Sequence, residues 1–231
     1  MSAEKMGFTQ KTMQYAAREL EKYSLLVLGE RCDIALTCDG EDDFDDGYEI
    51  SVRKGCGVIR GRNARSVLMG VYGLFYELGC RFIRPGKDGD RLVKRTKEDC
   101  TAEKVFRPKY RHRGVCSEGA VSAENLMEMA RWLPKIGMNS FFLQFSDGHL
   151  FFEKWYRHKG SSVLKAEKYG VADSARHYAE VAEVIKTCGL IFHAVGHGWT
   201  TEPLGYITYG EKASQDKDIL PEHRKLFAGR S

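Results

Sequence analysis

Hydrophobic and polar positions in the first hundred residues follow two different periods. Apolar side chains recur at helical spacing in two segments, whereas the segments between them alternate apolar with polar residues or form short apolar runs. The pattern predicts a helix, a strand, a hairpin and a second helix, over residues 8–23, 33–38, 48–61 and 63–78. Gly79 is placed as the C-cap of the second helix. This order is typical of an α+β layer, in which helices cover one face of a sheet.

From residue 106 onward the pattern alternates strands with helices. A linker leads into a strand that ends at Glu118, and a helix with N-cap chemistry begins near Ser122. A continuous apolar run over 140–145 predicts a parallel strand buried on both faces. After a long loop, a second helix and a third strand are predicted over about 173–188 and 190–195. Strand, helix, strand, helix, strand is the repeat of a parallel α/β unit.

Composition and charge exclude several classes of protein. The chain has 231 residues, 42% of them hydrophobic, which suits one large domain or two modest ones. A net charge of +4 without a clustered basic stripe argues against a nucleic-acid partner, and no window approaches the roughly 18 apolar residues of a membrane span. Seven cysteines without a Cys-x-x-Cys pair, and an N-terminus without a secretory pattern, predict free thiols in a reducing cytoplasm.

Two groups of residues invite comparison with metal sites. The acidic run from Glu41 to Asp46 lacks the alternating ligands and fixed glycine of a calcium loop, so we interpret it as a solvated hairpin loop. His193, His197 and Glu202 have the spacing of helical zinc ligands, but we expect them on a strand and a loop, where that spacing does not converge. His193 is expected as a core histidine. The lack of a glycine-rich phosphate loop after a strand argues against a nucleotide-binding protein. We expect neither a metal nor another cofactor.

A succession of motifs runs through residues 48–86. A predicted strand is followed by Gly-x-Ile-x-Gly at 57–61 and by a helix that ends in Leu-Gly-x-Arg-Phe at 78–82. This succession resembles the accessory domain that precedes the barrel in β-N-acetylhexosaminidases and α-glucuronidases. In those families the domain supports the barrel and carries no catalytic group. The resemblance implies that residues 1–105 form a scaffold domain.

The second half carries three further motifs: Tyr110-Arg-His-Arg-Gly114, Trp132-Leu-Pro-Lys-Ile-Gly-Met-Asn139 and Gly196-His-Gly198. They resemble the entry to the first strand, the Lys-x-x-x-Asn helix exit and the third-strand Gly-His pair of the hexosaminidase-type barrel, in which that pair lines the sugar site. The resemblance implies an α/β fold of two parts: a small α+β accessory domain over 1–105, and over 106–231 an incomplete N-terminal portion of a (β/α)8 TIM barrel.

The chain departs from the hexosaminidase pattern in three ways. The arginine that the family uses after the first strand falls on Val121, with Glu118 at the accompanying acidic position. The third-strand segment lacks the family's Pro-Glu-x-Asp stretch. The catalytic Asp-Glu pair of the fourth strand has no counterpart in this chain. We therefore assign no catalytic residue by resemblance.

The length of the second half shapes the functional expectation. A TIM barrel has eight strands and typically about 250 residues, whereas 126 residues follow Val105. We expect a truncated, hexosaminidase-like glycoside hydrolase that acts on O-glycosidic bonds and is inactive without the missing barrel half. An open three-stranded piece would expose a parallel edge, so we expect the chain to form a homodimer through that edge, to swap elements or to be poorly ordered at its end. The alternative is a non-catalytic carbohydrate-binding or remnant protein.

In such a barrel the ligand site forms at the carboxyl ends of the strands. Five residues near these ends are predicted to contact a sugar: His197, Trp199, Asp147, Arg113 and Glu118. Polar side chains of these types bind hydroxyl groups, and an indole stacks on the apolar face of a sugar. Alternative roles are a backbone cap for His197, loop packing for Trp199 and a turn for Asp147. Arg113 has an ion pair in the barrel floor as its alternative, and Glu118 a helix cap. Glu118 and Asp147 are also the candidate carboxyl pair for glycoside hydrolysis.

Overall fold

The structure, a computed structural model, describes residues 3–40, 45–118, 121–144, 152, 155–158 and 161–195. The chain divides into two compact units. The first unit comprises residues 1–115, 124–141 and 180–192, and the second comprises 116–123, 142–179 and 193–231. Helices and strands are mixed along the described chain, so the fold is of the α/β type that the sequence predicts.

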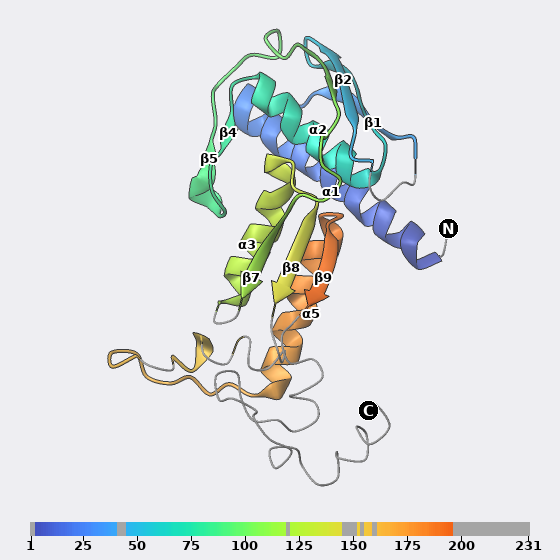
Figure 1. Cartoon of the computed structure of the whole chain (residues 1–231). Coiled ribbons are helices and arrows are strands. Elements are labelled where there is room, and N and C mark those ends of the chain that lie inside the picture. The colour runs from blue at the N-terminus through green and yellow to red at the C-terminus, as the bar shows by residue number, and fades with distance from the viewer. Residues whose placement is uncertain are drawn as a thin grey trace. The chain divides into compact units, whose positions relative to one another are not determined.

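A four-stranded sheet with strand order β1-β3-β2-β6 lies in the first unit (Figure 1). Strand β1 is parallel to β3, whereas β2 is antiparallel to both β3 and β6. The strands are Asp33–Cys38 (β1), Tyr48–Arg53 (β2), Cys56–Gly61 (β3) and Ala102–Phe106 (β6). The predicted strand and hairpin are confirmed. The sequence pattern does not predict β6, because two adjacent charged residues interrupt the alternation of apolar and polar positions. In the structure, its Val105 is 65% exposed.

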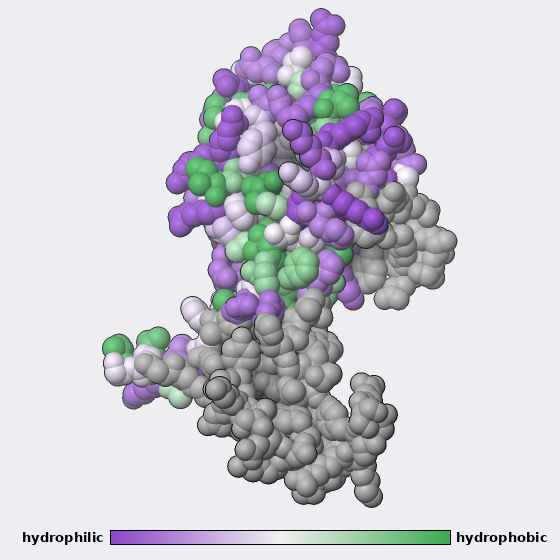
Figure 2. Space-filling view, in the orientation of Figure 1, coloured by the Kyte–Doolittle hydropathy of each residue, from purple (hydrophilic) through white to green (hydrophobic). Residues whose placement is uncertain are grey.

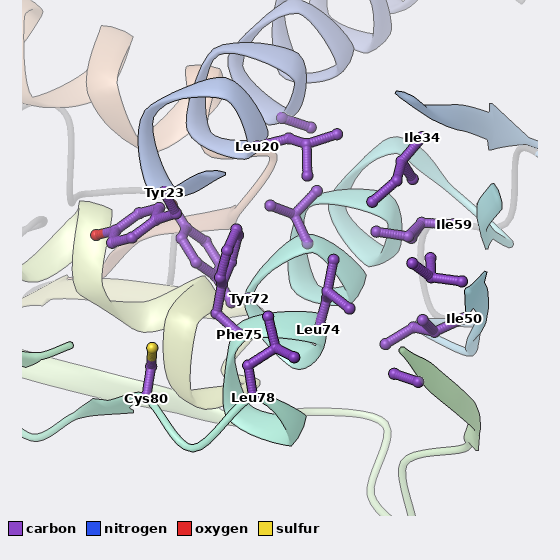
Figure 3. Close-up of a cluster of buried hydrophobic side chains, with 14 of the residues drawn as sticks. Leu20, Tyr23, Ile34, Ile50, Ile59, Tyr72, Leu74, Phe75, Leu78 and Cys80 are labelled. Atoms are coloured by element: carbon purple, nitrogen blue, oxygen red, sulfur yellow. The ribbon is translucent and has the colours of Figure 1, made fainter. Parts of the chain in front are cut away.

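Helices α1 (Ala3–Leu28) and α2 (Ala64–Glu77) cover one face of this sheet (Figure 1). Alternate residues of β2 are buried toward the helices, as the period of a half-buried strand requires. Asn63 and Ser66 form a capping box at the start of α2, and Gly79 follows its C-cap residue with a positive φ. The buried side chains in Figure 3 come from both helices and from β1, β2 and β3, so this sheet and its two helices share a single core.

Gly57 of β3 marks the tightest backbone contact of this sheet. Its φ is +147°, and a Cβ atom there would lie 2.1 Å from the carbonyl oxygen of Ser51. We expect Gly57→Ala to lower the free energy of unfolding by about 3 kcal/mol, because it combines backbone strain with overpacking. Gly7→Ala is the matched control, since nothing lies within 4 Å of a Cβ at that position. Urea unfolding of both variants measures the difference, and equal stabilities would contradict the prediction.

A two-stranded sheet and a 3-10 helix follow α2. Strand β4 (Arg81–Phe82) pairs antiparallel with β5 (Asp90–Arg91), and the 3-10 helix η1 (Lys87–Gly89) connects them. Phe82 packs its ring edge-on against both Tyr23 and Tyr72 at centroid distances of 5.4 Å. The end of the Leu-Gly-x-Arg-Phe motif is therefore an ordered extension of the α1–α2 core.

Three further strands form a sheet of order β7-β8-β9, which is also their order along the chain. They are Gly114–Glu118 (β7), Ser140–Gln144 (β8) and Ile191–Val195 (β9), and their arrows point the same way in Figure 1. The intervening helices are α3 (Ala123–Trp132), the 3-10 helix η2 (Leu133–Ile136) and α5 (Val171–Thr187). The predicted alternation of strand and helix is confirmed. Its membership in a TIM barrel remains a prediction.

On the face shown in Figure 2, the described surface is mainly hydrophilic, with separate hydrophobic patches. Within the described part of the chain, no helix combines the length and the apolar composition needed to cross a membrane. All seven cysteines carry free thiols, as the sequence predicts.

Candidate functional site

Alternate side chains of β7 and β8 form a partly exposed face near the carboxyl ends of these strands. Cys116 and Glu118 are exposed, and Phe142 and Gln144 are partly exposed, whereas Phe141 and Leu143 are fully buried. Because successive side chains of a strand point to opposite faces, residues two apart lie on the same face. The prediction that 140–145 is buried on both faces is therefore wrong for the described part of β8. We call the face formed by Cys116, Glu118, Phe142, Gln144 and His193 the strand-end face.

Contacts between neighbouring strands show that these side chains share one face. The Cys116 thiol donates a hydrogen bond to Oε1 of Gln144, with an S···O distance of 3.3 Å. Between β8 and its other neighbouring strand, β9, the rings of Phe142 and His193 stack with a centroid distance of 4.1 Å and an interplanar angle of 6°. His193 is thus partly exposed beside an aromatic ring. The face combines a flat aromatic surface with an amide and a carboxylate, which are the groups that sugar recognition uses.

Glu118 is the carboxylate of the strand-end face. It is exposed at the last position of β7, two residues from Cys116. Burial and the nearby Glu118 carboxylate both raise the pKa of the Cys116 thiol. That thiol is therefore mainly protonated at neutral pH, which suits a hydrogen-bond donor to Gln144 better than a nucleophile.

An aromatic cluster in the second unit holds part of the segment that follows β8. The rings of Tyr156 and Tyr169 stack at a centroid distance of 4.8 Å, and His177 of α5 lies 4.8 Å from the Tyr156 ring. The hydroxyl of Tyr156 accepts a hydrogen bond of 3.0 Å from the backbone N–H of Ala123, the first residue of α3. The sequence predicts only a long loop here. Aromatic residues spaced irregularly through a loop carry no periodic signal, so only the folded chain brings them together.

The structure describes two of the five residues that the sequence predicts as sugar contacts. His197, Trp199 and Asp147 lie outside the described residues. Glu118 belongs to the strand-end face. Arg113 lies directly before β7, at the opposite end of the strand from Glu118, and its guanidinium donates to Asp46, Gly137 and Tyr110. The structure therefore describes Arg113 in the alternative role, an ion pair with a carboxylate.

Asp46 is the centre of a buried polar network in the first unit. Its Oδ2 accepts hydrogen bonds of 2.7 Å from both Arg113 Nη2 and Asn139 Nδ2. Its Oδ1 accepts from Arg65 Nε at 2.9 Å and Nη2 at 2.6 Å, and from Asn63 Nδ2 at 3.1 Å. Burial opposes ionisation of this carboxyl, but the Arg65 guanidinium and the hydrogen bonds hold its pKa below the usual value. The expectation of a solvated acidic loop is wrong for Asp46, which is fully buried.

The network joins the segments that precede all three strands of the β7-β8-β9 sheet. Arg113 precedes β7 and Asn139 precedes β8, and Arg65 Nη1 donates a hydrogen bond of 2.7 Å to the carbonyl oxygen of Gly189, shortly before β9. The Asn139 side chain also accepts from the backbone N–H of Arg113 at 2.8 Å. One carboxylate therefore helps to set where each strand begins. The sequence offers no signal for it, because Asp46 stands in a run of acidic residues.

Lys135 supplies a second anchor in the same unit. Its ammonium group lies 2.9 Å from both carboxylate oxygens of Asp90 and 2.6 Å from the hydroxyl of Tyr23. It also lies 5.0 Å from the ring centroid of Phe82 and 5.8 Å from that of Tyr72. Burial lowers the pKa of Lys135, and Asp90 opposes that shift. Lys135 and Asn139 are the two named residues of the Lys-x-x-x-Asn motif, so in this chain the motif is a structural anchor.

Metal-ligating side chains are not grouped in the described chain. Among the residues that the structure describes, no three His, Cys, Asp or Glu side chains lie together as a metal ion would require. Of the zinc candidates weighed from the sequence, His193 belongs to the strand-end face, and His197 and Glu202 lie outside the described residues.

The chain resembles known proteins in fold. No family model and no curated protein sequence matches it. Among solved structures, it is similar to the N-acetyl-β-hexosaminidase of Streptomyces plicatus in complex with Thio-NAglucal, with a TM-score of 0.51 and 15% identity. It is also similar to a family 89 glycoside hydrolase from Clostridium perfringens in complex with PUGNAc, with a TM-score of 0.51 and 14% identity.

These likenesses cover most of this chain but a minor part of the enzymes. The first covers 79% of this chain and 38% of the Streptomyces chain, and the second covers 82% and 25%, respectively. At such low identity the likeness shows the fold alone. The fold is therefore glycoside hydrolase-like, in agreement with the hexosaminidase resemblance in the sequence.

Proposed function

We propose that this chain provides the accessory domain and the first barrel strands of a glycoside hydrolase that acts on O-glycosidic bonds, with a hexosaminidase-like sugar site. The observation that carries the proposal is the strand-end face. It presents the Gln144 amide and the Glu118 carboxylate at the carboxyl-terminal residues of β8 and β7, with the Phe142–His193 stack at the middle of β8 and β9. Ligand sites of barrel enzymes form at this end of the strands. His197, Trp199 and Asp147 follow the same strands in the sequence and complete the proposed site.

In this proposal the role of Arg113 rests on its contacts, and the roles of Asp147 and Trp199 rest on the sequence. Glu118 and Asp147 serve as the carboxyl groups nearest the sugar, and Trp199 provides its stacking platform. Arg113 acts indirectly, because its guanidinium is bound to Asp46 and holds the start of β7. Residues 1–105 serve as scaffold. The similar enzymes are described in complex with Thio-NAglucal and PUGNAc, so an N-acetylhexosamine is the first sugar class to test.

Calorimetric titration of the chain with N-acetylglucosamine and with PUGNAc tests the proposal. We expect saturable binding of at least one of these probes, and we expect Trp199→Ala and His197→Ala to weaken it about 10-fold or more, since each removes a direct contact. Trp155→Ala is the matched control, because this indole is 48% exposed and is not assigned to the site. Absence of saturable binding would contradict the proposal. If Trp155→Ala loses binding and Trp199→Ala does not, Trp155 is the stacking platform and the proposed role of Trp199 is wrong.

A second candidate function, a non-catalytic carbohydrate-binding protein, shares the same face and differs in the role of the carboxylates. Glu118→Gln and Asp147→Asn keep the size of each side chain while removing its charge. The test uses a form of the protein that hydrolyses a chromogenic N-acetylglucosaminide. If the proposed hydrolase is correct, each variant lowers the rate of this hydrolysis by about 100-fold or more. If only binding is affected and no turnover is present, the second function stands.

A further inference from the structure

Three segments of the first unit meet at the tip of the β2–β3 hairpin and bring two thiols together. The backbone N–H of Asp33 donates to the carbonyl oxygen of Gly55 at 2.8 Å, and the N–H of Gly55 donates to that of Cys100 at 2.8 Å. Gly55 is therefore hydrogen-bonded both to Asp33, which follows Cys32 in the chain, and to Cys100. The thiols of Cys32 and Cys100 are both free, and each shifts the pKa of the other across this junction.

The two thiols differ in their access to solvent. Cys100 is fully buried. Cys32 is partly exposed and lines an open groove of about 480 Å³ between α1 and β1, together with Arg31, Ile34 and residues of α1. A small polar oxidant entering this groove therefore reaches Cys32 before Cys100.

The surroundings of Cys32 favour its thiolate. The Cys100 thiol is the largest influence and lowers the pKa of Cys32 to about 6, aided by the positive charge of Lys97, while burial and Glu30 oppose the shift. The Cys32 thiol in turn raises the pKa of Cys100. Burial raises the pKa of Cys188 to about 12. Thiolate character and exposure together decide which thiols react with oxidants.

We propose that Cys32 and Cys100 form a redox-sensitive pair, in which a hydroperoxide oxidises Cys32 and Cys100 then closes an intrachain disulfide. In the first step the Cys32 sulfur attacks one peroxide oxygen, the O–O bond breaks, and a sulfenic acid forms as the other oxygen leaves as water or alcohol. In the second step the Cys100 sulfur attacks the Cys32 sulfur, the S–O bond breaks, and the hydroxyl leaves as water with the Cys100 proton. The peroxide gains the two electrons that the two thiols lose.

The disulfide would link both edges of the four-stranded sheet. Cys32 immediately precedes β1, one edge strand, and Cys100 shortly precedes β6, the opposite edge strand. Closing a long loop of the unfolded chain stabilises a folded domain. Oxidation is therefore expected to raise the melting temperature by several degrees, and a reductant should reverse the change. This inference concerns the first unit and does not depend on the proposed sugar site.

Peptide mapping of the wild-type chain after brief treatment with hydrogen peroxide tests the pair directly. The chain is blocked with N-ethylmaleimide and digested without reductant, and we expect a peptide linked through Cys32 and Cys100. Cys56→Ser is the matched control, because Cys56 is exposed at the same end of the sheet and should leave the link unchanged. A link through Cys56, or only intermolecular links, would overturn the proposal.

Two further measurements identify the attacking thiol. In Cys100→Ala, dimedone should trap a sulfenic acid at Cys32, whereas Cys32→Ser should show no adduct at Cys100. In the wild type, alkylation of Cys32 by iodoacetamide should reach half its maximal rate near pH 6, well below the value of about 8.5 for a free cysteine. A midpoint at the ordinary value would refute the role of Cys32 as the first thiol to react. The wild-type measurements require no variant to fold.

Discussion

Asp46→Ala should lower the free energy of unfolding by about 3–5 kcal/mol, the usual cost of removing one partner from a buried ion pair. The substitution leaves the guanidinium groups of Arg65 and Arg113 without the carboxylate that they share, and these side chains are only 6% and 14% exposed. It also removes one of the two acceptors of the Asn139 amide nitrogen, which keeps its bond to the carbonyl oxygen of Arg111. Urea unfolding of the full chain measures the loss.

Asp45→Ala is the matched control for this prediction. The Asp45 carboxylate is 42% exposed, and its ion pair with Arg62 has an N···O distance of 3.5 Å. Exposed pairs of this kind contribute less than about 1 kcal/mol. If the two variants lose the same stability, the buried network does not have the importance that its hydrogen bonds imply.

The same network predicts the sign of a pH effect. The pKa of Asp46 is lower in the folded chain than in the unfolded chain, where an aspartate titrates near 3.9. As the pH falls below about 4, the unfolded chain therefore binds the proton first, and the wild type loses stability. Asp46→Asn lacks this titration, so its stability should fall less steeply over the same range. A steeper loss in the variant would reverse the assignment.

Lys135→Ala should cost about 3 kcal/mol, because it leaves the Asp90 carboxylate without its cation and removes the packing of the lysine side chain against three aromatic rings. The side chains of this pair are 10% and 14% exposed. Lys54→Ala is the matched control, since Lys54 and its partner Glu98 are 63% and 72% exposed. That substitution should cost less than about 1 kcal/mol.

A double substitution distinguishes the charge pair from simple packing. Lys135→Met combined with Asp90→Leu removes both charges and keeps apolar volume, so it should recover most of the stability that Lys135→Ala loses. A double variant as unstable as Lys135→Ala would mean that the pair contributes net stability beyond an apolar replacement. Thermal unfolding of the wild type, Lys135→Ala and the double variant under identical conditions provides the comparison.

Local periodicity was sufficient to predict most elements of this protein. The apolar spacing of α1 and α2, the alternation in β2 and the glycines of the hairpin each depend on residues close in sequence, and the structure has these elements. The alternation of strands and helices after residue 106 is of the same kind. The resemblance to hexosaminidases also rests on local motifs in sequence order, and the similar solved structures support it at the level of the fold.

The tertiary structure alone decided which polar residues are buried and with which partners. Asp46 cannot be told from its acidic neighbours in the sequence, because its burial depends on Arg65, Arg113 and Asn139, which lie 19 to 93 positions away. Lys135 depends in the same way on Asp90, and Cys32 on Cys100. Sequence patterns report the period of one element, whereas a buried charge or a thiol pair is defined by contacts between elements. For the same reason, the sequence alone did not predict the strand-end face, which is formed by five residues from three strands.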